Sequence, residues 1–201
     1  MNDPETFEQA VERVFAFHTK RAPGIYIGVA MVRYALEALG SAAQVGKLNA
    51  VCETSTCLPD CLQVLIGCTV GVRYLKIHDE IGRYALTIYS RESGQGIRVF
   101  VDLDKIDSAR TPELYNFFYR TRSLSDNEAR EASGRKVIEE FAREGRKVLG
   151  LQRVRLREFG KTPILPARRC PICRESYLIR DEKHDKCDYC SGLSAYYALE
   201  N

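Results

Sequence analysis

The sequence lacks the features that would place a protein in or across a membrane. It has no run of about 20 uncharged apolar residues, the length that a bilayer-spanning helix needs. Its N-terminal segment is charged and amphipathic, whereas a signal peptide has an apolar core. We therefore expect a soluble protein with no membrane contact, in a reducing, cytoplasmic compartment where disulfides are not formed.

The sequence also lacks a large net charge and the common motifs of phosphate binding and acyl transfer. Its 30 Lys and Arg against 27 Asp and Glu give a net charge of +3, which excludes a polycation that binds nucleic acid unselectively. Basic residues gather only between Arg143 and Arg169, where nine Lys or Arg stand against two Glu. There is neither a Gly-rich P-loop nor a Ser nucleophile elbow, so no motif identifies a substrate.

Hydrophobic periodicity predicts an α+β core domain over residues 1–159, with helices packed on a mainly antiparallel sheet. Helical spacing of apolar residues is found over residues 4–19, 23–39, 111–121 and 125–149. Alternating patterns typical of strands cover residues 48–52, 74–78, 84–89, 97–101 and about 153–157, the last with one basic face. Short Gly-containing turns between the middle strands indicate hairpins. Residues 160–169 are predicted to be a linker to a small module over residues 170–201.

Four of the eight cysteines form two C-x2-C pairs in that module. Cys170 and Cys173 are separated from Cys187 and Cys190 by thirteen residues. Each pair can offer two thiolates to one tetrahedral Zn²⁺, and a module of this size has too little core to fold without such a site. We therefore predict a structural four-cysteine zinc site, closed to catalysis, with a short helix over 194–199 that favours a treble-clef-like module.

The other four cysteines lie in one stretch at the centre of the core domain, at positions 52, 57, 61 and 68. Thr56 is expected to cap a helix that begins at Cys57, so the helix dipole would favour a thiolate there. On a continuous helix Cys57, Cys61 and Cys68 would share one face. The surrounding leucines also allow simple packing. We assign Cys52 and Cys61 to packing and leave Cys57 open between chemistry and packing.

The core domain contains three ordered motifs over roughly residues 7–105. They read Phe17-His18-x4-Pro23-Gly24, Glu53-x3-Cys57-x2-Asp60-x2-Gln63-x3-Gly67-Cys68-Thr69-x-Gly71 and Asp79-x2-Gly82-Arg83-Tyr84-Ala85. Together these motifs resemble the FmdE family, which is linked to formylmethanofuran dehydrogenase. The resemblance implies an α+β core, a C-terminal zinc finger and a homodimer. It also implies an accessory or metal-handling role beside a molybdenum or tungsten enzyme, rather than the catalytic component itself.

The resemblance further implies a metal or redox site in a cleft between the His18 turn and the cysteine helix. His18 and Cys57 would be its catalytic or metal-ligating residues. Glu53, Asp60 and Cys68 would be supplementary ligands. The family motif has His and Cys where this chain has Lys20 and Ala22, so two ligands of a second metal are missing. Lys20 and Arg21 would instead make the cleft bind anions or would pair with its carboxylates.

The sequence therefore leaves three functions open. The first is a metal-binding accessory protein of the FmdE type, with one structural zinc and a candidate second metal near His18 and Cys57. The second is an enzyme of unknown reaction that uses Cys57 as a low-pKa nucleophile or metal ligand beside His18. The third is a zinc-finger adaptor or regulator whose basic strand and zinc module contact nucleic acid or, alternatively, a protein partner.

Overall fold

The computed structural model describes residues 5–43, 46–122, 124–160, 163–182 and 184–200. The chain forms two compact units, Met1–Gly160 and Lys161–Asn201, each of which we describe by itself. Residues 161 and 162 of the predicted linker lie outside the described residues. Three further residues of that linker, Ala167–Arg169, form strand β6 of the second unit.

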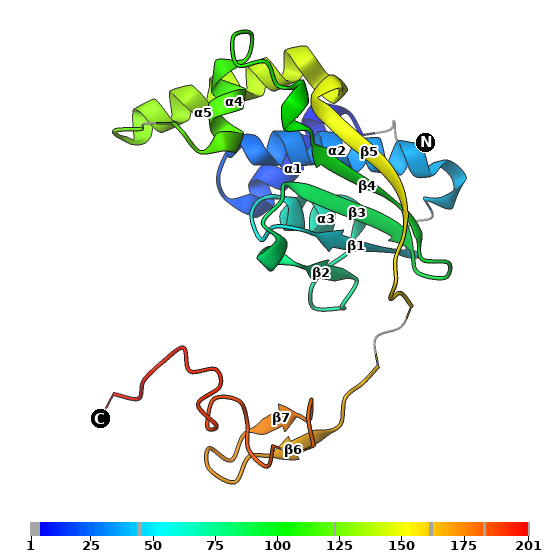
Figure 1. The fold of residues 1–201 in the computed structure, drawn as a ribbon, viewed down its shortest axis with the longest axis vertical. Coiled ribbons are helices and arrows are strands. Elements are labelled where there is room, and N and C mark those ends of the chain that lie inside the picture. The colour runs from blue at the N-terminus through cyan, green and yellow to red at the C-terminus, as the bar shows by residue number, and fades with distance from the viewer. Residues whose placement is uncertain (1–4, 44–45, 123, 161–162, 183, 201) are drawn as a thin grey trace. The chain divides into compact units, whose positions relative to one another are not determined.

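Within its described residues, the first unit contains five α-helices and one five-stranded sheet (Figure 1). The helices are α1 (Phe7–His18), α2 (Pro23–Leu39), α3 (Leu58–Ile66), α4 (Pro112–Tyr119) and α5 (Asn127–Glu144). The strands are β1 (Leu48–Cys52), β2 (Leu75–Ile77), β3 (Ala85–Ser90), β4 (Gln95–Val101) and β5 (Leu149–Arg155). The predicted α+β class is therefore confirmed.

The sheet has the strand order β2-β1-β3-β4-β5. Its three pairings among β1, β3, β4 and β5 are antiparallel, and only β1 and β2 run parallel. Register follows the alternation that the sequence predicted: Leu86 lies opposite Val99, and Ile88 opposite Ile97, so these side chains share one face. That face is fully buried. The sheet is mixed but mainly antiparallel.

Helix α2 is the centre of the core. It contacts β3 and β4, packs against α1 and α3, and is covered further along by α5, while α3 contacts β1 and β2. The segment Pro23–Ala42, which includes α2, is long and apolar enough to span a membrane by length and composition. The buried core helix of a folded domain passes the same test, and Arg33 and Glu37 interrupt this segment. Here Ile25, Val29 and Val32 of α2 are fully buried in the core.

One predicted helix is longer than the observed one, and another is absent. The helix predicted over 125–149 ends at Glu144, because Gly145 follows with a positive φ of 57° and a 3₁₀ turn covers Gly145–Val148. Leu149 then begins β5. The short helix predicted over 194–199 is absent, since the second unit has no helix among its described residues and only the hairpin of β6 and β7 (Ser176–Leu178). The treble-clef element that this helix would have supplied is therefore not seen.

Close packing of α2 on α3 depends on Gly28. A Cβ at Gly28 would lie 2.6 Å from the Cys61 Sγ and 3.1 Å from a Leu58 methyl. We expect Gly28→Ala to force the two helices apart and to cost about 1–3 kcal/mol of unfolding free energy, measured by urea denaturation. Gly134→Ala in α5 is the control, because its Cβ would meet Pro23 at an ordinary 3.4 Å. It should be neutral or stabilising by up to about 1 kcal/mol; equal stability of the two variants would contradict this account.

Candidate functional site

The four C-terminal cysteines come together in the second unit. Their Sγ atoms all lie within 4.8 Å of one another. Each C-x2-C pair is a tight turn: the Arg174 N–H donates to the Cys170 carbonyl at 3.0 Å, and the Ser191 N–H to the Cys187 carbonyl at 3.0 Å. The Cys190 N–H also points at the Cys187 Sγ, at 3.4 Å. Two turns thus present four sulfur atoms to one point.

The spacing of these sulfur atoms fits a tetrahedral zinc. With Zn–S bonds of about 2.3 Å, two thiolates on one zinc lie about 3.8 Å apart, and the Cys173 and Cys187 Sγ atoms are 3.8 Å apart. Hydrogen bonds from backbone amides, that of Cys187 foremost, lower the pKa of Cys170 to about 6. Burial and the neighbouring cysteines raise the pKa of Cys190 to about 12. A cation is therefore needed before all four can be thiolates together.

In the core domain, Cys57 does not begin the helix as predicted; it precedes it. Cys57 is the N-cap residue of α3, with φ 55° and ψ −54° and no side-chain cap. The Leu58 N–H donates to the Thr56 carbonyl at 2.6 Å, which makes Cys57 the central residue of a γ-turn with positive φ, a rare and strained conformation. Thr56 is therefore not the cap. This turn sets the direction of the Cys57 side chain.

His18, Asp60 and Cys57 meet at this turn. The His18 Nδ1 donates to the Asp60 Oδ2 at 2.6 Å, and the His18 Nε2 lies 4.0 Å from the Cys57 Sγ. His18 is the last residue of α1 and Asp60 lies in the first turn of α3. The carboxylate thus orients the imidazole, so that its other nitrogen faces the thiol. The predicted association of His18 with Cys57 is present in the structure.

The environment of Cys57 does not favour a thiolate. Burial, and then the charge of Asp60, raise the pKa of the Cys57 thiol to about 11. The expected lowering by the dipole of α3 is therefore outweighed. Asp60 contacts the His18 Nδ1, whereas Cys57 faces the other ring nitrogen, so these three residues do not form a metal-like cluster among the described residues. Two ligands alone do not fit a firmly held metal.

The remaining cysteines of the central stretch do not join Cys57 at the cleft. The Cys61 thiol donates to the Ile25 carbonyl at 3.7 Å and the Cys68 thiol to the Leu48 carbonyl at 3.5 Å. Helix α3 ends at Ile66 and Gly67 takes a left-handed conformation, so Cys68 cannot continue the helical face. Cys52 is fully buried in the core.

Glu53 lies elsewhere, beneath a pair of arginines. Its buried carboxylate accepts from Arg98 Nε at 2.6 Å, from Arg98 Nη2 at 2.8 Å and from Arg83 Nε at 2.7 Å. Lys20 is exposed and does not line the cleft. Arg21 pairs with Glu12. The cationic role expected of Lys20 and Arg21 in the cleft therefore falls to other arginines.

Cys57 opens onto a cleft of about 680 Å³ at the end of the sheet. Its lining comes from the start of α2, the Thr54–Cys57 segment, the adjoining ends of β3 and β4, and α4 with the residues after it. The lining includes four arginines, at positions 83, 98, 120 and 122, and no Asp or Glu. Arg83 and Tyr84 belong to a recognised motif, but Arg98, Arg120 and Arg122 carry no local sequence signal and were missed.

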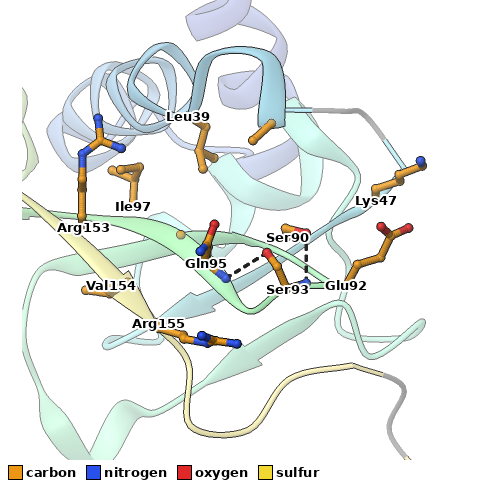
Figure 2. A pocket seen from close by; sticks show the side chains of 12 residues that line it. Leu39, Lys47, Ser90, Glu92, Ser93, Gln95, Ile97, Arg153, Val154 and Arg155 are labelled. Atoms are coloured by element: carbon orange, nitrogen blue, oxygen red, sulfur yellow. Dashed lines mark hydrogen bonds between the residues drawn. The ribbon is translucent and has the colours of Figure 1, made fainter.

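A second hollow of about 670 Å³ lies at the other end of the sheet (Figure 2). Lys47, Arg153 and Arg155 line it together with Glu92 and small polar residues of the β3–β4 turn. Arg153 and Arg155 continue the face of β5 on which Leu149 and Leu151 lie opposite Val101 and Val99. The predicted basic face of this strand is thus a local extension of an apolar face.

The fold and the two sites define an α+β protein with a His–Asp–Cys cluster at a core cleft and an appended four-cysteine candidate metal site. The family model described as FmdE, Molybdenum formylmethanofuran dehydrogenase operon, matches residues 17–156. The chain therefore belongs to the FmdE family.

Two relatives extend this assignment. A tungsten formylmethanofuran dehydrogenase FmdE-like protein from Syntrophus aciditrophicus has a similar crystal structure, with a TM-score of 0.77, 32% identity and 95% of each chain covered. A probable S-adenosyl-L-methionine-binding protein from Archaeoglobus fulgidus is 32% identical over an alignment 201 residues long, which covers 93% of this chain and 53% of that protein. The chain thus spans about half the length of that relative.

The raised pKa of Cys57 predicts a slow alkylation rate. At pH 8 its thiolate fraction should be about a hundredfold below that of a thiol with the ordinary value. Iodoacetamide labelling followed by peptide mass spectrometry would measure it. Asp60→Asn removes a charge that raises this pKa, so labelling should become faster. Glu80→Gln, at an exposed carboxylate, should change nothing; a wild-type Cys57 as reactive as free cysteine would refute the assignment.

The Glu53 cluster predicts an acid-sensitive fold. Burial raises the pKa of Glu53, but hydrogen bonds and charges of Arg98 and Arg83 outweigh it and hold the pKa below 4.5. A carboxylate with a lowered pKa stabilises the folded state above its unfolded pKa, and this contribution is lost as the pH falls through the folded value. Unfolding free energy should therefore drop below about pH 4.5. Glu53→Gln should be less stable at neutral pH and show a shallower acid dependence; an unchanged profile would contradict this role.

Proposed function

We propose that this protein is a metal-binding accessory protein of a formylmethanofuran dehydrogenase system, with a structural zinc in its four-cysteine module. The observation that carries the proposal is the convergence of four Sγ atoms within 4.8 Å. Membership of the FmdE family supports the link to that operon. A closed four-thiolate sphere leaves no position for substrate, so the zinc would hold the small module together rather than catalyse a reaction.

The enzyme alternative has less support than the accessory role. Its nucleophile would be Cys57, whose pKa of about 11 keeps the thiol protonated near neutral pH. His18 faces that thiol but is itself held by Asp60. The nucleic-acid alternative would use the basic end of β5, where Glu92 lies among the cations and no observation favours a phosphate backbone.

The Archaeoglobus relative suggests a second candidate function, the binding of S-adenosyl-L-methionine. The cleft has the volume of a small-molecule site and aromatic walls in Phe117 and Phe118. Its charge argues against this ligand, because four arginines without a lining carboxylate repel a sulfonium cation. An unchanged melting temperature of the wild-type protein on adding S-adenosyl-L-methionine would remove this candidate.

A homodimer is part of the proposal through the family resemblance. Strands β2 and β5 are the two edges of the sheet in the part of the chain that the structure describes. An edge strand can pair with a second copy. Light scattering of the full chain would measure the oligomeric state.

Metal analysis tests the zinc proposal directly. Protein purified without added metal should contain about one zinc per chain, bound by four thiolates. Cys170→Ser and Cys187→Ser should each lose most of it and loosen the small module, because metal binding is also folding free energy there.

Cys57→Ser is the matched control for that experiment. It removes a thiol that faces His18 rather than the four-cysteine cluster, so the zinc content should stay unchanged. Wild-type protein without zinc would overturn the proposal. A second metal that disappears only in Cys57→Ser would show that the core cleft is a metal site as well.

A further inference from the structure

The arginine wall of the core cleft has an unbalanced charge. Glu53 lies behind the wall and neutralises one positive charge through Arg98 and Arg83. The negative charge of Glu113 is attracted to the Arg122 guanidinium. Arg122 donates a hydrogen bond to the Ser133 hydroxyl, which donates one to the Glu113 carboxylate. Four lining arginines against these two carboxylates leave two positive charges at the cleft. Such a site attracts anions.

Arg120 is the arginine best placed to meet a ligand. Its side chain is exposed at the cleft and has no ion pair among the residues described here. Arg120 caps the C-terminus of α4 with φ 55° and ψ 33°, a left-handed conformation that non-glycine residues seldom adopt. Cys57, which lines the same cleft, also has a strained backbone. Two strained residues in the lining of one cleft are typical of binding sites.

The polar side chains of the cleft are mostly donors. Guanidinium groups only donate hydrogen bonds. The Tyr84 hydroxyl donates to the Gly24 carbonyl at 2.7 Å, and Cys57 is a neutral thiol. The paired hydroxyls of Thr54 and Thr56 are the main side-chain acceptors. A ligand that satisfies this lining must therefore carry several acceptor oxygens.

The lining also includes four aromatic residues, Tyr84, Phe100, Phe117 and Phe118. Phe117 and Phe118 are packed edge to face at 5.0 Å, Phe118 packs on Tyr84 at 5.3 Å, and Phe100 lies under Arg98. All of these side chains line the cleft. Aromatic walls beside guanidinium groups suit a flat apolar body that carries an anionic group.

We propose that the core cleft is a binding site for a small organic anion, with Arg120, Arg122 and Arg83 holding its carboxylate or phosphate and Phe117 and Phe118 contacting a planar body. This site is separate from the four-cysteine zinc site and does not depend on the proposed accessory role. Cys57 also lines this cleft, and His18 faces its thiol, so a bound anion would share the cleft with the thiol.

Calorimetric titration of the full chain, as purified, tests the site. The probes are phenyl phosphate, benzoate, inorganic phosphate and neutral benzyl alcohol. Phenyl phosphate or benzoate should bind at least about tenfold more tightly than benzyl alcohol, and more weakly as salt is raised. Phenyl phosphate against benzoate separates a phosphate from a carboxylate ligand, and inorganic phosphate measures the contribution of the ring.

Arg120→Gln should weaken binding of the preferred anion about tenfold, because it removes one charge-assisted contact. Arg135→Gln, at an exposed arginine of α5 outside the cleft, should stay within about twofold of wild type. Circular dichroism would show that both variants are folded. The proposal would be overturned if benzyl alcohol bound as tightly as the anions, if neither phenyl phosphate nor benzoate bound, or if Arg120→Gln left the affinity for the preferred anion unchanged.

Discussion

The core domain depends on the close approach of helices α2 and α3. Gly24 and Gly28 lie one turn apart on α2, and Cβ atoms there would come within 2.8 Å of the Cys57 Sγ and 2.6 Å of the Cys61 Sγ. Two glycines thus receive two cysteines at the same four-residue spacing. The repeated cysteine spacing in the sequence is largely a packing pattern, since sulfur side chains are small enough to sit over glycine. Only Cys57, at the end of this contact, also reaches an open cleft.

Two kinds of chemistry meet at the cleft. His18, Asp60 and Cys57 form a hydrogen-bonded cluster with a neutral thiol, and of these three only Cys57 lines the cleft. The lining also contains four arginines, two of them fixed by the buried Glu53. Because both oxygens of the Glu53 carboxylate accept hydrogen bonds from these arginines, Glu53 cannot also serve as a ligand beside the Cys57 thiol. It is a positioning residue for the wall.

Features set by local chemistry were predicted from the sequence, and features set by distant contacts were not. The four zinc-spaced cysteines were found because each C-x2-C turn is local. The strands were found because one buried face produces their alternation. The arginine wall was missed because β4, the end of α4 and the segment after it come together only in the fold. The pKa of Cys57 was misjudged for the same reason, since burial and Asp60 outweigh the helix dipole.

The structure shows where the two family residues that this chain lacks would lie. The resemblance places a histidine and a cysteine where this chain has Lys20 and Ala22. Ala22 and Cys57 both line the cleft, so a cysteine at position 22 would add a second thiol to the lining, whereas the alanine offers no ligand atom there. The same lining contains four arginines. In this member of the family, the charge and donors of the cleft therefore match an organic anion better than they match a metal ion.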